Sequence, residues 1–129
     1  MKTLCNYTQD ALTILFDSMG AFFAFGDTQF NQSKKDGVDY CLLKNGLIVP
    51  KENAKALLDG LESITAKGIA SDLSENGRKA IIRRELFNHE CFYTNDISDC
   101  VEALSGYGIE QGEIRAEYLH IRASEDIDL

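Results

Sequence analysis

The sequence has little of what marks a disordered or membrane-inserted chain. It contains one proline and no low-complexity run among its 129 residues, and this composition argues against extended disorder. Its most apolar stretch, residues 11–25, holds only 15 residues and includes Asp17, so it is too short and too charged to span a bilayer. The N-terminus lacks a signal-peptide pattern. We therefore expect a soluble, cytoplasmic protein that does not enter a membrane.

Close cysteine pairs and phosphate-binding loops are also missing. The four cysteines are Cys5, Cys41, Cys91 and Cys100. They include no C-x-x-C pair, and without a secretory signal the reduced state is favoured. A zinc site built from His89, Cys91, Cys100 and His120 would have spacings that match no familiar structural site. No glycine-rich loop follows a strand in the manner of nucleotide-binding proteins. We accordingly predict no metal, no cofactor and no catalytic residue.

The hydrophobic pattern predicts a mainly helical α+β domain. The length suits one domain spanning residues 1–129, with a flexible tail from about residue 124 to 129. Periodic apolar positions predict five or six helices. We expect them at about residues 8–19, 27–32, after Pro50, from Arg78, after a cap at Thr94 or Asn95, and at 109–121, with a polar break at 71–77.

One β-hairpin is predicted around Asn45-Gly46. This dipeptide tolerates the positive φ angles of a type I′ turn, whose twist suits paired antiparallel strands. The flanking strands would be residues 38–43 and 47–49, and Pro50 would end the second one. A short apolar run at residues 21–25 favours a further strand because it is brief and rich in aromatic residues.

The net charge of −8 is distributed unevenly along the chain. Residues 1–84 hold 11 Lys or Arg against 10 Asp or Glu, whereas residues 85–129 hold 2 Arg against 11 Asp or Glu. Six of these acidic residues are spaced by three or four on the outward faces of the last two predicted helices, where carboxylates become neighbours. They form a candidate acidic ridge: Asp96, Asp99, Glu102, Glu110, Glu113 and Glu117. Such a ridge either confers solubility or binds a basic groove on another protein.

A dense polar cluster at residues 88–96 is the alternative candidate site. Its members are Asn88, His89, Glu90, Tyr93 and Asp96, with Cys91 between them. A base, a thiol and carboxylates lie close in sequence here, but His89 and Cys91 point roughly 200° apart on a continuous helix. The same residues also suit a helix end followed by a new helix start. A structural role for this cluster is therefore the stronger interpretation.

Basic and aromatic residues each suggest a further kind of surface. The basic residues at 78–84 and Lys34-Lys35 would suit nucleic acid, but the acidic chain lacks the broad basic field that such binding normally needs. The four aromatic residues Phe22, Phe23, Phe25 and Phe30 fall within nine positions. We expect them mostly in the core. An exposed Phe23 or Phe30 would mark a surface for a partner or for self-association.

Three segments carry a resemblance to known sequences. They are AFFAFGDTQF (residues 21–30), the Ile48-Val49-Pro50-Lys51 junction, and ELFNHECFYTNDI (residues 85–97). Over roughly residues 20–105 the chain resembles a family of small uncharacterised proteins from Bacteroides-type gut bacteria, their phages and mobile elements. The resemblance implies a bacterial or phage cytosolic protein. It assigns no activity and no catalytic residue.

Together these features favour a non-enzymatic interaction or regulatory module that uses the acidic ridge to bind another protein. Small acidic proteins that block nucleic-acid-handling enzymes are a class to consider by analogy alone. The first alternative is a small-ligand binder or enzyme centred on residues 88–96. The second is a nucleic-acid binder through residues 78–84. Formation of a homo-oligomer is compatible with each of these hypotheses.

Overall fold

The computed structural model describes residues 1–124 and confirms a mainly helical α+β fold with a small antiparallel sheet. The chain divides into two compact units, which are described separately. The sheet unit is Leu4–Gly68, and the helical unit is Met1–Thr3 with Ile69–Leu129. A single domain over the whole chain stays a prediction. Apart from Ser124, the predicted tail lies outside the described residues.

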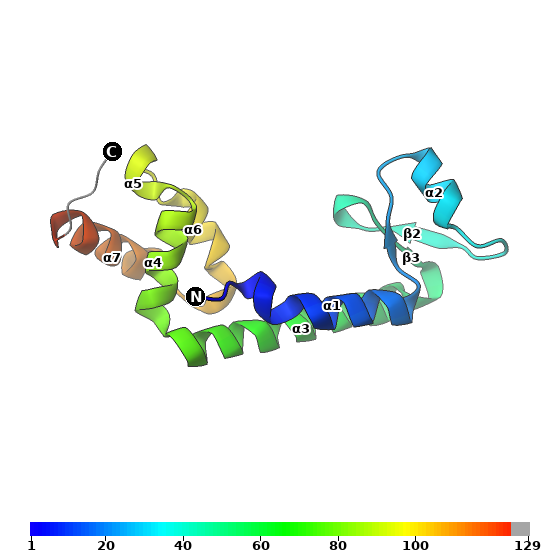
Figure 1. Ribbon diagram of the computed structural model, residues 1–129, viewed down its shortest axis with the longest axis horizontal. Helices are drawn as coiled ribbons and strands as arrows, with labels where there is room; N and C mark the ends of the chain where they lie inside the picture. Colours follow the sequence, from blue (N-terminus) through cyan, green and yellow to red (C-terminus); the bar gives the residue numbers. More distant parts are fainter. Residues whose placement is uncertain (125–129) are drawn as a thin grey trace. The chain divides into compact units, whose positions relative to one another are not determined.

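The sheet unit combines three short strands with two helices and the first part of a third (Figure 1). Its elements are α1 (Leu4–Met19), β1 (Phe22–Phe23), α2 (Asp27–Ser33), β2 (Tyr40–Leu42), a 3₁₀ turn (Lys44–Gly46), β3 (Leu47–Pro50), a second 3₁₀ turn (Lys51–Asn53) and the first part of α3 (Ala54–Asn76). The strand order is β1-β3-β2, and both pairings are antiparallel.

The predicted hairpin is confirmed and has the expected turn chemistry. Asn45 and Gly46 adopt φ angles of 62° and 77°, in the left-handed region that a type I′ turn requires. The backbone N–H of Leu47 donates to the carbonyl of Lys44 across this turn. The strands pair Leu42 with Ile48, and β1 joins the other edge of β3. The third strand thus comes from the aromatic run before α2.

The core of the sheet unit lies between the central strand and α3. Leu47, Val49 and Leu57 are buried together, and α1 packs along α3 through glycines (Figure 1). A Cβ on Gly68 would lie 2.5 Å from the Thr8 methyl group, so only glycine allows the two helices to approach this closely. Leu58 of α3 is exposed, although its neighbour Leu57 is buried in this core.

The helical unit is organised around α4. It comprises the end of α3, α4 (Arg78–Asn88), α5 (Cys91–Thr94), α6 (Ser98–Ala103), a 3₁₀ turn (Ser105–Tyr107) and α7 (Gln111–Ser124). Helix α4 packs against α5, α6 and α7. Buried residues from all of these elements fill the core: Ile81, Ile82, Leu86, Cys91, Phe92, Cys100, Leu104, Tyr107, Ile109, Ile114 and Ile121.

Three of the predicted helix boundaries are wrong. Helix α1 begins at Leu4 and not near residue 8. Helix α3 continues through the expected polar break to Asn76, and only Gly77, with a φ of 79°, separates it from α4. The polar residues of this segment remain helical because Asp72 among them is a buried hydrogen-bonding group. The predicted cap at Thr94 or Asn95 is also displaced, since α6 begins at Ser98. Within residues 1–124, no helix has the length and apolar character needed to cross a bilayer.

Candidate functional site

The polar cluster at residues 88–96 lies at the junction between α4 and α6. Asn88 ends α4, His89 follows it, and Glu90 adopts a left-handed conformation with a φ of 54°. A glutamate rarely occupies this region, so the bend is a local strain that the surrounding packing must hold. The single turn of α5 then inserts Phe92 into the core, where it contacts the rings of Phe87 and Tyr118. The junction thus positions a core aromatic residue.

The side chains of this cluster do not converge on one point. His89 Nε2 lies 3.3 Å from a carboxylate oxygen of Glu85, and the Asn88 amide donates weakly to the same carboxylate. Asp96 instead accepts hydrogen bonds from the backbone N–H and hydroxyl of Ser98, at 2.9 and 2.6 Å. Those bonds lower the pKa of Asp96. Asp96 therefore binds Ser98, the first residue of α6, from the position before the N-cap residue Ile97.

Glu90 and Tyr93 are exposed on the surface of the same junction. Cys91, the thiol between them, is buried. Burial raises the pKa of the Cys91 thiol, as does the charge of Asp96 nearby. A thiol with a raised pKa is protonated at neutral pH and is a poor nucleophile. This geometry gives the enzymatic alternative no activated nucleophile at Cys91.

A buried charge network, which the sequence pattern did not indicate, occupies the helical unit. Asp72 is fully buried, and its two carboxylate oxygens accept bonds of 2.9 Å from two guanidinium nitrogens of Arg84. The Tyr107 hydroxyl donates at 2.6 Å and the Asn76 amide at 2.8 Å. Arg84 also donates to Glu85 at 3.0 Å. Four donated bonds satisfy both oxygens of Asp72, as a buried carboxylate requires.

The electrostatics of this network follow from burial and hydrogen bonding. Burial alone would raise the pKa of Asp72, but the bonds from Arg84, Tyr107 and Asn76 outweigh it and lower the pKa below the ordinary value of 3.8. Burial would lower the pKa of Arg84, but its carboxylate partners hold it above the ordinary value. Both groups therefore remain charged at neutral pH and tie α3 to α4.

Two of the basic residues that could contact nucleic acid, Arg78 and Arg84, are already paired with carboxylates of the protein. Arg84 is only 10% exposed and faces Asp72. Arg78 forms two bonds with the Glu113 carboxylate, at 2.9 and 2.6 Å, and donates to the Gly108 carbonyl. Arg83 lies over the Phe87 ring, with 5.3 Å between guanidinium carbon and ring centroid. The 78–84 segment therefore presents less free positive charge than its sequence suggests.

The six residues of the predicted acidic ridge occupy α6, α7 and the segments just before them. Asp96, Asp99, Glu102 and Glu110 are exposed, whereas Glu113 and Glu117 are half-buried. Helices α6 and α7 pack against each other. The bonds from Arg78 lower the pKa of Glu113 and neutralise its charge locally. The ridge is thus interrupted at Glu113, while the four exposed carboxylates stay available to solvent.

A second surface, on the sheet unit, is apolar. Phe23, Phe25, Leu42 and Leu58 are 49%, 76%, 71% and 50% exposed. The Phe23 and Phe25 rings stack with centroids 6.4 Å apart. A hollow of about 810 Å³ lies beside Phe23, Leu42 and Leu58. The exposure of Phe23 meets the condition that the sequence set for a partner or self-association surface, while Phe30 is half-buried.

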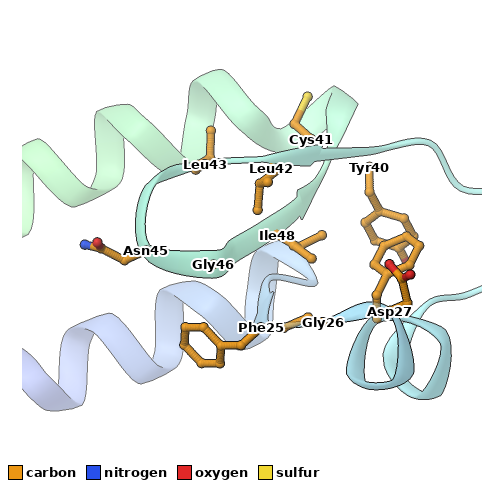
Figure 2. A pocket seen from close by; sticks show the side chains of 12 residues that line it. Phe25, Gly26, Asp27, Tyr40, Cys41, Leu42, Leu43, Asn45, Gly46 and Ile48 are labelled. Carbon is orange, nitrogen blue, oxygen red and sulfur yellow. The ribbon is translucent and has the colours of Figure 1, made fainter.

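A neighbouring hollow of about 670 Å³ shares Leu42 with the first (Figure 2). Phe25 and Asn45 stand at one end of it, and Tyr40 and Asp27 at the other. Tyr40 packs edge-on against Phe22 and Phe30, with centroids 5.5 and 5.7 Å apart. Phe22 and Phe30 of the aromatic run therefore pack together with Tyr40, whereas Phe23 and Phe25 stay at the surface.

Comparison with known proteins identifies a family without assigning an activity. The model of a family of unknown function, DUF7659, matches residues 4–123. The chain therefore belongs to this family. No curated protein and no solved structure matches it.

Proposed function

We propose that this protein is a non-enzymatic interaction or regulatory module that binds another protein through its acidic surface. The observation that carries the proposal is the group of exposed carboxylates Asp96, Asp99, Glu102 and Glu110 on and beside packed helices of one unit. Over its whole length that unit holds 13 Asp or Glu against 7 Lys or Arg. The excess negative charge is thus concentrated in one part of the chain.

The chemistry of this surface indicates a partner with a basic groove. Carboxylates three residues apart on a helix are neighbours, so α6 presents adjacent negative charges at Asp99 and Glu102. Repeated negative charge can take the place of a nucleic-acid backbone in a basic groove, and association would be fast and sensitive to salt. We include in the proposal a cytoplasmic setting in Bacteroides-type gut bacteria, their phages or mobile elements, on the strength of the sequence resemblance.

The two alternatives gain less from the geometry. An enzyme or ligand site at residues 88–96 would use His89, but His89 and Asn88 face Glu85, and Cys91 is buried. Nucleic-acid binding through residues 78–84 would need arginines that are paired with carboxylates. The exposed carboxylates of the acidic surface could bind a partner without breaking ion pairs of this kind.

A charge-reversal experiment tests the proposal. The variant Asp99→Lys/Glu102→Lys/Glu110→Lys changes three exposed carboxylates of the helical unit. The matched control, Asp10→Lys/Asp17→Lys/Asp36→Lys, makes the same change in net charge on exposed residues of the sheet unit. Immobilised wild type and both variants are used to capture proteins from a Bacteroides lysate at about 50 mM salt and again at about 300 mM, where screening is stronger.

We expect wild type and control to retain a common set of basic proteins, identified by mass spectrometry. The acidic-surface variant should lose that set, and raising the salt should release it from the wild type. Equal capture by both variants would refute the proposal. Equal retention would mean that the acidic surface is not needed, and equal loss would mean that net charge rather than the ridge is responsible. Capture that resists salt would refute it too.

A further inference from the structure

Four exposed apolar residues of the sheet unit form one continuous surface. This sheet patch comprises Phe23, Phe25, Leu42 and Leu58, and the half-buried Leu43 and Leu61 line the same hollow as Phe23, Leu42 and Leu58. The stacked rings of Phe23 and Phe25 join its two ends, and Leu42 borders both hollows. Single exposed apolar residues are ordinary on protein surfaces, but a contiguous group of large ones marks an interaction site.

The size of the patch fits one half of an ordinary protein interface. A phenylalanine side chain can bury about 150–250 Å². With similar or slightly smaller areas for leucine, the exposed fractions of the four residues correspond to roughly 450 Å² of apolar surface. A standard interface buries about 800 Å² per partner, of which about 56–65% is apolar. The patch therefore supplies about the apolar area that one partner contributes.

Charge indicates what kind of partner covers the patch. Lys44 is the one charged residue among those lining the larger hollow, so a partner recognised by charge would gain little there. The sheet unit carries 6 Lys against 8 Asp or Glu, while the chain as a whole carries −8. Two copies of this chain repel each other least where their surfaces are nearly neutral.

The shape of the patch suits pairing with itself. In a two-fold dimer the same surface is used by both partners, so a projecting group on one copy meets a hollow on the other. Phe25 and Leu42 are the most exposed patch residues; Phe25 borders the hollow of about 670 Å³, and Leu42 borders both that hollow and the one of about 810 Å³. We propose that two copies of this protein form a two-fold dimer in which the sheet patches cover each other.

The oligomeric state of the full-length protein tests this proposal. The monomer has a mass of 14.4 kDa. Light scattering after gel filtration, together with sedimentation equilibrium over about 1–100 µM, should report twice that mass for the wild type, since this range brackets micromolar dissociation constants. A wild type that is monomeric throughout this concentration range would overturn the proposal. This holds even if the sheet patch binds a different protein.

Two double variants locate the interface. Phe25→Ser/Leu42→Ser removes the most exposed patch residues, and we expect the dissociation constant to rise more than about tenfold, as the loss of hot-spot residues predicts. Ile14→Ser/Leu119→Ser removes apolar residues that are 69% and 55% exposed outside the patch, and it should remain dimeric. Far-UV circular dichroism checks that each variant is folded. A patch variant that stays fully dimeric would refute the assignment.

Salt separates this inference from the acidic-surface proposal. An apolar interface is not weakened by screening, so about 1 M NaCl should leave the dimer intact. The acidic-surface variant should also dimerise. Dissociation of the wild-type dimer by salt would contradict an apolar interface, whereas loss of basic partners alone would leave the dimer proposal unaffected.

Discussion

Replacing Asp72 by asparagine should destabilise the helical unit more than most single substitutions. Asp72 is fully buried and Arg84 is 10% exposed. Asparagine keeps the size of the side chain but removes the negative charge and one acceptor oxygen, and its NH₂ group would face N–H donors. Removing one partner of a buried ion pair costs about 3–5 kcal/mol because the other charge is left uncompensated.

The contacts that remain place the expected loss near the lower end of that range. Arg84 keeps its 3.0 Å bond to Glu85 and a bond to the Lys2 carbonyl. We therefore expect the free energy of unfolding to fall by about 3 kcal/mol, a large fraction of the about 5–15 kcal/mol typical of a domain. For a chain of this length the melting temperature should fall by about 12 °C.

Urea and thermal unfolding followed by far-UV circular dichroism measure this loss. Tyr107→Phe is a graded comparison, because it removes a single donor to Asp72 and should cost about 1–3 kcal/mol. Asp72→Asn/Arg84→Met removes both charges, so its cost should be smaller than the two single losses combined. If Asp72→Asn lies within about 0.5 kcal/mol of the wild type, as ordinary surface substitutions do, the network does not stabilise the unit and the reasoning is wrong.

Three further outcomes follow from the same structure. The pKa of Asp72 in the folded protein lies below its ordinary value of 3.8. The ionised Asp72 therefore contributes its full stabilisation above about pH 4, and this contribution is lost as the pH falls through the lowered pKa. When the free energy of unfolding is measured against pH, it should fall less below about pH 4 in Asp72→Asn than in the wild type. Gly46 has a φ of 77° in the hairpin turn, and Gly46→Ala should cost about 1–2 kcal/mol in a urea titration, whereas a cost near zero would mean that the turn relaxes freely. Cys5 is exposed while Cys91 and Cys100 are buried, and burial raises the pKa of Cys100 to about 12. A thiol reagent should therefore modify Cys5 in the folded protein, and Cys91 and Cys100 only as the helical unit unfolds; equal rates of modification would contradict this packing.

Local sequence signals predicted the fold class and the hairpin because they act over a few residues. Asn45 and Gly46 accept positive φ angles whatever surrounds them. The extent of α3 could not be predicted in this way. Its polar segment reads as a break until Asp72 is paired with Arg84, 12 positions further on. A buried ion pair between helices leaves no periodic trace, because each partner alone resembles an ordinary surface charge.

The candidate sites show the same difference between local and long-range information. The spacing of Asp99 and Glu102 placed them on one exposed helical face, and both are exposed. The loss of Glu113 from the ridge depends on Arg78, 35 positions away, and no local pattern indicates it. The aromatic run gave a partial signal. Its excess of large rings implied that some would stay at the surface, but only the pairing of β1 with β3 decides which ones.

Binding through the acidic surface and dimerisation through the sheet patch should respond to salt in opposite ways, so the two can be tested together. Screening weakens attraction between the acidic surface and a basic groove, but it also weakens repulsion between two chains of charge −8. Dimerisation through the sheet patch should therefore hold or strengthen as salt rises, while partner binding declines. A dimer would present two acidic units to a repeated basic surface, and the second contact would then form at a high effective concentration. Phe25→Ser/Leu42→Ser should for that reason weaken binding to an extended basic partner although it leaves every carboxylate in place, and it should not change binding to a partner with one basic groove.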